Sequence, residues 1–193
     1  MTRIPEAHVA TPIDPYAAQR EKWRSFPRVR PPNIVRPGPG QESVWDYPRP
    51  PRVEPVPRAV RVVFDGLVIA LSGRAVRVCE TSSPPCYYIP PADVDLDRVA
   101  ASARTSFCEW KGLAHYWTVR SPRREAKDSA WSYPAPDPGF EVLRDHLAFY
   151  PRRMDACYVG DQRVEPQPGF YYGGWVTSDL VGPFKGVPGS EGW

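Results

Sequence analysis

The stretch that decides the fold of this chain is Val60-Arg61-Val62-Val63-Phe64-Asp65-Gly66-Leu67-Val68-Ile69-Ala70. Two runs rich in β-branched and apolar side chains flank the pair Asp65-Gly66. Aspartate followed by glycine suits a two-residue hairpin turn, because both turn positions need a positive φ. The stretch therefore predicts a β-hairpin at the beginning of a core that starts near Val60.

Further runs with the composition of β-strands follow this hairpin along the chain. We expect strands over residues 75–79, 86–89, 113–119, 146–150 and 156–159. Between the second and third of these, Leu96, Val99 and Ala103 fall on one face at helical spacing. This spacing predicts one short core helix over residues 93–104.

The amount of proline separates this chain from an ordinary globular protein. The 193 residues include 26 Pro, together with 7 Trp, 10 Tyr and 7 Phe. Proline fixes φ and donates no backbone hydrogen bond, so it interrupts helices and is confined to turns and strand edges. Because disordered chains are usually poor in aromatic residues, the composition favours an ordered, mostly β fold with long connections.

The chain divides by composition into three parts. Residues 1–58 form a Pro- and Arg-rich N-terminal arm, in which we expect one short helix over residues 15–26 and an extended linker over residues 30–40. Residues 59–160 form the core, and residues 161–193 form a Gly- and aromatic-rich extension that packs on it. The predicted fold class is a small, mostly β, sandwich-like domain of two sheets.

Charge and hydropathy argue against two classes of partner. The net charge is +3 at pH 7 and the arginines form no compact basic stripe, so we expect no nucleic-acid binding. No apolar run approaches the roughly 20 residues that a membrane-spanning helix needs. Because the first 30 residues also lack the apolar segment of a signal peptide, we expect a cytoplasmic protein that crosses no membrane.

The cysteines are spaced unlike those of a metal site. They are Cys79, Cys86, Cys108 and Cys157, with no Cys-x-x-Cys pair among them. In a reducing compartment we expect all four to be free thiols. Structural zinc sites usually contain such pairs, so we expect neither a metal nor a cofactor.

One run in the middle of the core concentrates chemically active side chains. It reads Cys108-Glu109-Trp110-Lys111-Gly112 and is followed by Ala114-His115-Tyr116-Trp117. Cys108 is a candidate nucleophile or redox thiol, and Lys111 is a candidate anion-binding or Schiff-base amine. Glu80, at the end of a predicted strand, is a candidate general base or partner for Lys111. The alternative for Cys108 is a buried, unreactive thiol, and for Lys111 it is a salt bridge at a turn. For Glu80 it is a solvated position at the end of a strand.

Aromatic side chains are candidates for the walls of a ligand pocket. The candidates are Tyr88, Trp110, Tyr116, Trp131 and Tyr133. In an extended run, His115 and Trp117 face the side opposite to Tyr116. Either Tyr116 or the pair His115 and Trp117 therefore lines the pocket, but not both. The alternative is that these side chains fill the core of a small β domain.

The residues from about 60 to 159 resemble a known bacterial family. The segments that carry the resemblance are Phe64-Asp65-Gly66, Tyr87-Tyr88-Ile89-Pro90-Pro91-Ala92-Asp93-Val94, Thr105-Ser106-Phe107-Cys108-Glu109-Trp110-Lys111-Gly112 and Ala130-Trp131-Ser132-Tyr133-Pro134. They are similar to domain-of-unknown-function family 427, and the Gly-aromatic tail is similar to an extended, actinobacterial-type version. The resemblance implies a β-tent, in which two antiparallel sheets meet at an angle. The family also carries a nucleotidyltransferase-like label, but this chain has no Gly-Ser followed by spaced Asp residues that would hold magnesium and phosphates.

These observations leave three hypotheses for the function. The first is a small-molecule-binding protein or small enzyme with an aromatic-lined cleft that carries Glu80, Cys108 and Lys111. The second is a non-catalytic interaction module, in which residues 1–58 pair two copies of the chain as a homodimer. The third, carried by the family label, is nucleotide binding.

Overall fold

The pair Asp65-Gly66 forms a tight turn between β3 (Val60–Phe64) and β4 (Leu67–Ser72) in a computed structural model of the protein. Both turn residues have a positive φ, 54° for Asp65 and 73° for Gly66. The last residue of β3 is paired with the first residue of β4, so the predicted hairpin is confirmed. The structure describes residues 14–193.

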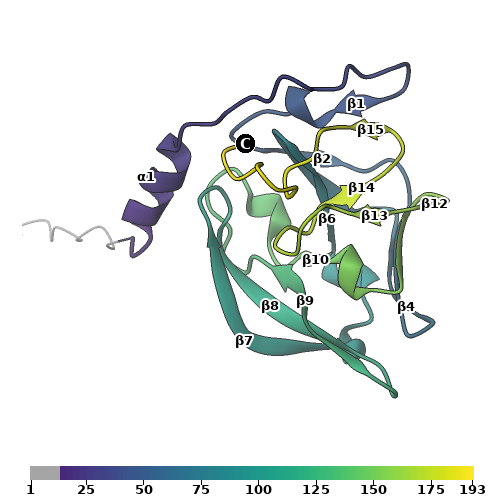
Figure 1. The fold of residues 1–193 in the computed structure, drawn as a ribbon. Helices are drawn as coiled ribbons and strands as arrows, with labels where there is room; N and C mark the ends of the chain where they lie inside the picture. The colour runs from purple at the N-terminus through teal and green to yellow at the C-terminus, as the bar shows by residue number, and fades with distance from the viewer. Residues whose placement is uncertain (1–13) are drawn as a thin grey trace, which may run out of the picture.

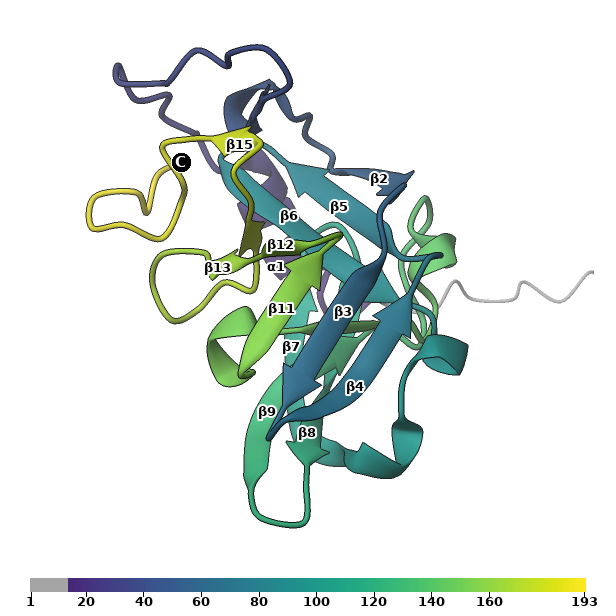
Figure 2. The same ribbon diagram turned by 90° about the vertical axis from the view of Figure 1, so that its right-hand side faces the viewer.

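Two antiparallel sheets make up the body of the protein (Figure 1). The larger sheet has seven strands in the order β2 (Arg52–Pro55), β5 (Val76–Glu80), β6 (Ser83–Ile89), β10 (Leu147–Phe149), β9 (Glu125–Ser132), β8 (Gly112–Arg120) and β7 (Val99–Cys108). The smaller sheet has four strands in the order β12 (Gln162–Arg163), β11 (Ala156–Val159), β3 and β4. Figure 2 shows the smaller sheet in front of the larger one. The predicted mostly β fold of two sheets is therefore confirmed.

Shorter elements join and cover the two sheets. Two further pairs of strands are β1 (Glu42–Ser43) with β15 (Leu180–Val181), which is parallel, and β13 (Glu165–Pro166) with β14 (Trp175–Val176), which is antiparallel. Short 3-10 turns lie at Val44–Asp46, Pro91–Asp93, Leu96–Arg98, Glu141–Leu143 and Pro151–Arg153. The first pair joins residues on both sides of the 59–160 segment, and the second lies within the C-terminal segment, where β14 contacts β6.

The core helix expected over residues 93–104 was wrong. A single helical turn, Leu96–Arg98, is followed at once by β7. This strand runs antiparallel to β8, from Val99 opposite Val119 to Cys108 opposite Gly112. The apolar residues of β7 are mostly small and none is buried, so their helical spacing marks no core face. Pairing with β8 therefore outweighs the local preference of these residues for a helix.

Neighbouring residues on the central strands of the larger sheet face opposite sides. On β6, Tyr87 packs into the apolar cluster between the two sheets, whereas Tyr88 packs into a second cluster on the outer face. On β9, Ala130 and Trp131 divide in the same way, as the two-residue period of a strand requires. One face of the larger sheet therefore builds the core with the smaller sheet, and the outer face carries a separate aromatic cluster.

The arm folds back toward the larger sheet. Helix α1 (Ala17–Ser25) lies where the sequence predicts a helix. Residues 30–40 contain no helix or strand and turn at 32–33 and 39–40, so they are not extended throughout. Just before α1, the Tyr16 ring stacks on Phe107 of β7 with 4.5 Å between ring centroids. Figure 1 shows α1 beside the end of the β7–β8 hairpin. Within residues 14–193, no helix has both the length and the apolarity needed to cross a bilayer.

Candidate functional site

The turn Glu109-Trp110-Lys111 joins β7 to β8 and places Lys111 beside the outer face of the larger sheet. Gly112 follows with a φ of 89°, and a Cβ at this position would lie 2.9 Å from Asp137 Oδ1. Glycine suits both the backbone conformation and the close approach. The Asp137 amide also donates a hydrogen bond to the Lys111 carbonyl (3.1 Å). The turn therefore fixes the backbone of Lys111.

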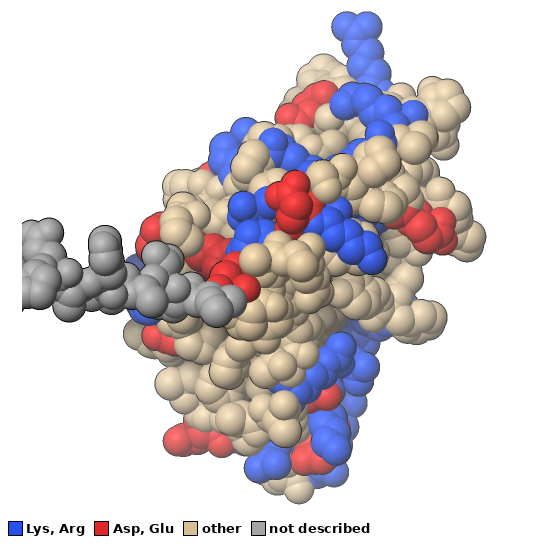
Figure 3. All heavy atoms as spheres, turned by 90° about the vertical axis from the view of Figure 1, so that its left-hand side faces the viewer, with Lys and Arg blue, Asp and Glu red and all other residues tan. Residues whose placement is uncertain are grey.

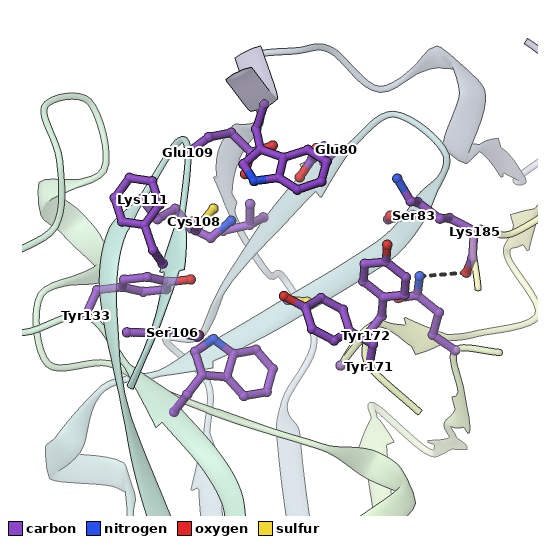
Figure 4. A pocket seen from close by; sticks show the side chains of 18 of the residues that line it. Glu80, Ser83, Ser106, Cys108, Glu109, Lys111, Tyr133, Tyr171, Tyr172 and Lys185 are labelled. Carbon is purple, nitrogen blue, oxygen red and sulfur yellow. Dashed lines mark hydrogen bonds between the residues drawn. The ribbon is translucent and has the colours of Figure 1, made fainter. Parts of the chain in front are cut away.

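A cavity of about 460 Å³ lies on the outer face of the larger sheet. This volume falls within the roughly 300–1,000 Å³ of ordinary small-molecule sites. Every predicted site residue except Trp110 lines it, namely Glu80, Tyr88, Cys108, Lys111, Tyr116, Trp131 and Tyr133. Figure 4 shows Lys111 and Tyr133 on one side of this cavity and Tyr171 and Tyr172 on the other.

Trp110 does not line the cavity and packs against the arm instead. The Arg24 guanidinium of α1 lies 5.0 Å from the centre of the Trp110 ring. The indole N–H is buried without a hydrogen-bond partner among residues 14–193. The Trp110 ring also packs against the aromatic cluster on the outer face of the larger sheet, so it lies between that cluster and α1.

Lys111 is a buried cation that faces the cavity. Its side chain is 8% exposed, and its Nζ lies 5.9 Å from the centre of the Tyr133 ring. Within the described part of the chain its ammonium has neither a hydrogen bond nor an ion pair. Burial opposes the charge, but nearby acidic groups, Glu80 among them, favour it, and the net effect raises the pKa of Lys111. The side chain therefore stays an ammonium, which favours anion binding over a Schiff base.

Two of the three carboxylates around the cavity, Glu80 and Glu109, are already paired with arginines. Arg49 Nε lies 3.1 Å from Glu80 Oε1, and Arg28 lies 3.6 Å from Glu109 Oε1. Figure 3 shows acidic and basic groups side by side on the face that carries α1. The structure therefore favours Glu80 as a partner for Arg49 over the general base considered above.

The four thiols fall into two pairs by environment. Cys86 and Cys108 line the cavity, whereas Cys79 and Cys157 are fully buried elsewhere. Burial raises the pKa of the Cys79 and Cys86 thiols to about 12 and raises that of Cys157 further. Cys108 lies beside the Lys111 ammonium, which it helps to stabilise. It is therefore the thiol best placed to react.

Hydroxyl groups of the aromatic wall form a partly satisfied network. Trp131 Nε1 donates to Tyr88 Oη (3.2 Å), and Tyr116 Oη is 3.0 Å from Ser106 Oγ. Burial raises the pKa of the Tyr88 and Tyr133 phenols, so both stay protonated. Among the described residues, Tyr133 Oη makes no hydrogen bond and is not sealed from the cavity. It is therefore a free donor close to Lys111.

The cavity is covered by the segment that follows β13. Gln167 is buried and joins two parts of this segment, since its Nε2 donates to the Lys185 carbonyl (2.8 Å) and its Oε1 accepts from the Gly174 amide (3.1 Å). A Cβ at Gly173 would overlap the Trp131 ring. The glycine therefore allows the segment to lie directly on the aromatic wall, which brings Tyr171 and Tyr172 over the cavity.

Helix α1 covers the other side. Its Trp23 lines the cavity. Arg20 pairs with Asp137 and donates to the Glu109 carbonyl (3.3 Å), and Arg24 donates to the same carbonyl (2.9 Å). These contacts tie the helix to the turn that carries Lys111.

A comparison with known families places the chain in one of them. A family model described as Domain of unknown function (DUF427) matches residues 52–160, more than half of the 193 residues. The chain belongs to the DUF427 family. No curated protein matches the chain by sequence.

The DUF427 segment builds only one side of the cavity. It contains Cys108, Lys111 and Trp131 and the strands that carry them. The covering residues Trp23, Tyr172 and Lys185 lie outside residues 52–160. The enclosed site in this DUF427 protein is therefore made jointly by the family segment and by the two flanking segments.

Lys185 is a second buried lysine at the cavity, 8% exposed. Its Nζ donates to the Trp193 carbonyl (2.7 Å). Burial, with Arg28 and Arg49 nearby, lowers the pKa of Lys185 to about 8. This lysine therefore releases its proton more easily than Lys111.

Several lining residues were missed by the sequence analysis. They include Trp23, Cys86, Tyr150, Tyr172 and Lys185. The signal for the C-terminal cover was the run Gly169-Phe170-Tyr171-Tyr172-Gly173-Gly174, in which small residues flank large rings. That run has no strand or helix period, so no face could be assigned to it.

Proposed function

We propose that this DUF427 protein binds a small organic molecule in the cavity on the outer face of the larger sheet. One observation carries the proposal: Lys111 is a buried ammonium that faces a cavity and has no partner among residues 14–193. Its Nζ is open to the cavity, so a group that enters the cavity can pair with it directly. A bound ligand would supply the missing partner, and the aromatic wall would supply contact area.

The three-part organisation of the chain supports this proposal. Residues 59–160 supply the aromatic wall with Lys111 and Cys108, and residues within 14–58 and 161–193 supply the cover. The described part of the arm contacts its own chain through Tyr16 and Arg20. This arrangement favours a cover over the alternative, in which the arm pairs two copies. Light scattering in solution tests that alternative, which requires a dimer that residues 1–58 hold together.

A nucleophilic role for Cys108 is part of the same proposal. Cys108 lines the cavity and lies near the Lys111 ammonium. Lys111 would therefore serve both as an anion anchor and as the cation beside the nucleophile. Glu80 would act on Lys111 only at longer range, because Arg49 holds its carboxylate.

A fragment screen with a site-specific readout tests the binding proposal. Fragments are screened for a rise in the melting temperature, and each hit is then tested for slowing the alkylation of Cys108 by iodoacetamide. We expect hits that protect Cys108 in the native protein and in Lys127→Met, an exposed lysine on β9. A library without any protecting hit would contradict the proposal, and so would hits that leave Cys108 as reactive as before.

A further inference from the structure

The charges that line the cavity leave one positive charge uncompensated. The cations are Arg28, Arg49, Lys111 and Lys185, and the carboxylates are Glu80, Glu109 and Glu191. Arg28 and Arg49 each have a carboxylate partner, and Lys185 donates to a backbone carbonyl. Lys111 is the cation whose ammonium makes neither a hydrogen bond nor an ion pair within residues 14–193. A ligand with one negative charge would balance this set.

The group nearest to Lys111 adds a directional requirement. Tyr133 lies under the Lys111 side chain, as Figure 4 shows, with Nζ 5.9 Å from the ring centre. The Tyr133 hydroxyl is protonated and has no acceptor among the described residues. A ligand group with two acceptor oxygens can take one hydrogen bond from Lys111 and one from Tyr133. A carboxylate has this geometry.

The walls favour a flat ligand body. Trp131 and Tyr133 lie on the sheet side of the cavity, and Tyr171 and Tyr172 lie on the covering side. Aromatic rings on opposite sides of a narrow site bind planar molecules by stacking and edge contacts. Gly173 packs against the Trp131 ring, which keeps the covering segment close to this wall.

We propose that the ligand is a planar aromatic molecule that carries a single carboxylate, bound with the carboxylate on Lys111 and Tyr133. This inference rests on the proposed function and names its ligand class. A phosphate group fits the site less well. It carries up to two negative charges and is usually held by several backbone N–H groups at a helix N-terminus or a glycine-rich turn. The charged groups that face this cavity are side chains, and most of them, Lys111 and Lys185 among them, lie in turns and loops outside the strands.

Isothermal titration calorimetry with matched probes tests the ligand class. The probes are 2-naphthoate, its neutral isostere 2-naphthamide, and phenyl phosphate. We expect the native protein to bind the acid about tenfold more tightly than the amide, since a charge-assisted hydrogen bond is lost in the amide. In Lys111→Met we expect the acid to lose this advantage while the affinity for the amide stays unchanged. Lys127→Met is the control and keeps the native preference.

A second variant keeps the test independent of the folding of Lys111→Met. Tyr133→Phe removes only a hydroxyl, and we expect it to weaken the acid more than the amide, because charge-assisted hydrogen bonds are the stronger ones. Equal binding of acid and amide would overturn the carboxylate inference and leave the binding proposal intact. Tighter binding of phenyl phosphate would overturn it in favour of a phosphate ligand. If the cavity binds none of the probes and no fragment protects Cys108, the binding proposal fails as well.

Discussion

Two lysines that line the same cavity differ in their neighbours. Lys111 lies near acidic groups, Glu80 among them, which raise its pKa against the effect of burial. Lys185 is buried as well, but Arg28 and Arg49 face it, and its pKa is lowered to about 8. Burial is the largest cause of the lowered pKa of Lys185, and Arg28 and Arg49 add to it, whereas acidic neighbours outweigh burial at Lys111.

The titration of Lys185 can be measured directly. The chain has only Lys22, Lys111, Lys127 and Lys185, so reductive methylation with ¹³C-formaldehyde gives a simple NMR spectrum. We expect one lysine resonance to titrate near pH 8 and to be missing in Lys185→Arg. The control variant is needed because an α-amino group titrates in the same range. A Lys185 resonance that titrates above pH 10 would contradict the expectation.

The thiols should react in an order set by their surroundings. At neutral pH we expect iodoacetamide to modify Cys108 first, because it lines the cavity beside an ammonium. Cys79 and Cys157 are fully buried with raised pKa values and should react only after unfolding. Peptide mass spectrometry over time measures the order. We expect Lys111→Met to slow the reaction at Cys108, and an unchanged rate would argue that the cation does not activate the thiol.

At the scale of elements, the turn between β7 and β8 depends on a glycine. We expect Gly112→Ala to lower the free energy of unfolding by about 1–3 kcal/mol, because a Cβ at positive φ is strained and would also press on Asp137. The matched control is Gly66→Ala, which has φ 73° and open space around it. Urea denaturation of both variants separates the contact with Asp137 from the backbone strain. An equal loss in the two variants would show that the contact contributes nothing.

The elements that the sequence predicted are those with a strong local signal. The Asp65-Gly66 pair fixed one hairpin, and the strand period correctly separated Tyr116, which lines the cavity, from the exposed His115. The β7 strand was missed because alanines at helical spacing gave a period, while pairing with β8 decided the structure. Most of the cavity floor could thus be predicted from strand periodicity. The cover could not, because its residues are brought there by long-range contacts such as those of Gln167.

At the scale of the whole molecule, stability and the proposed binding lie on opposite faces of one sheet. Phe149 is fully buried between the two sheets, whereas Tyr172 covers the outer face. We expect Phe149→Ala to cost about 3–5 kcal/mol of unfolding free energy, as large aromatic truncations in a core do. Tyr172→Ala should cost much less and instead weaken the binding of 2-naphthoate. Thermal denaturation and calorimetry on both variants measure the two effects, and a large loss of stability in Tyr172→Ala would contradict this separation.

The cavity of this DUF427 protein has two origins in the sequence, and this bears on how such a site evolves. Its anchoring cation and thiol belong to residues 52–160, and much of its roof belongs to segments outside that match. Substitutions in the roof can change the size and shape of the molecule admitted without disturbing Lys111. A lineage that exchanges the two flanking segments would therefore change the shape of the cavity without changing Lys111 or Cys108.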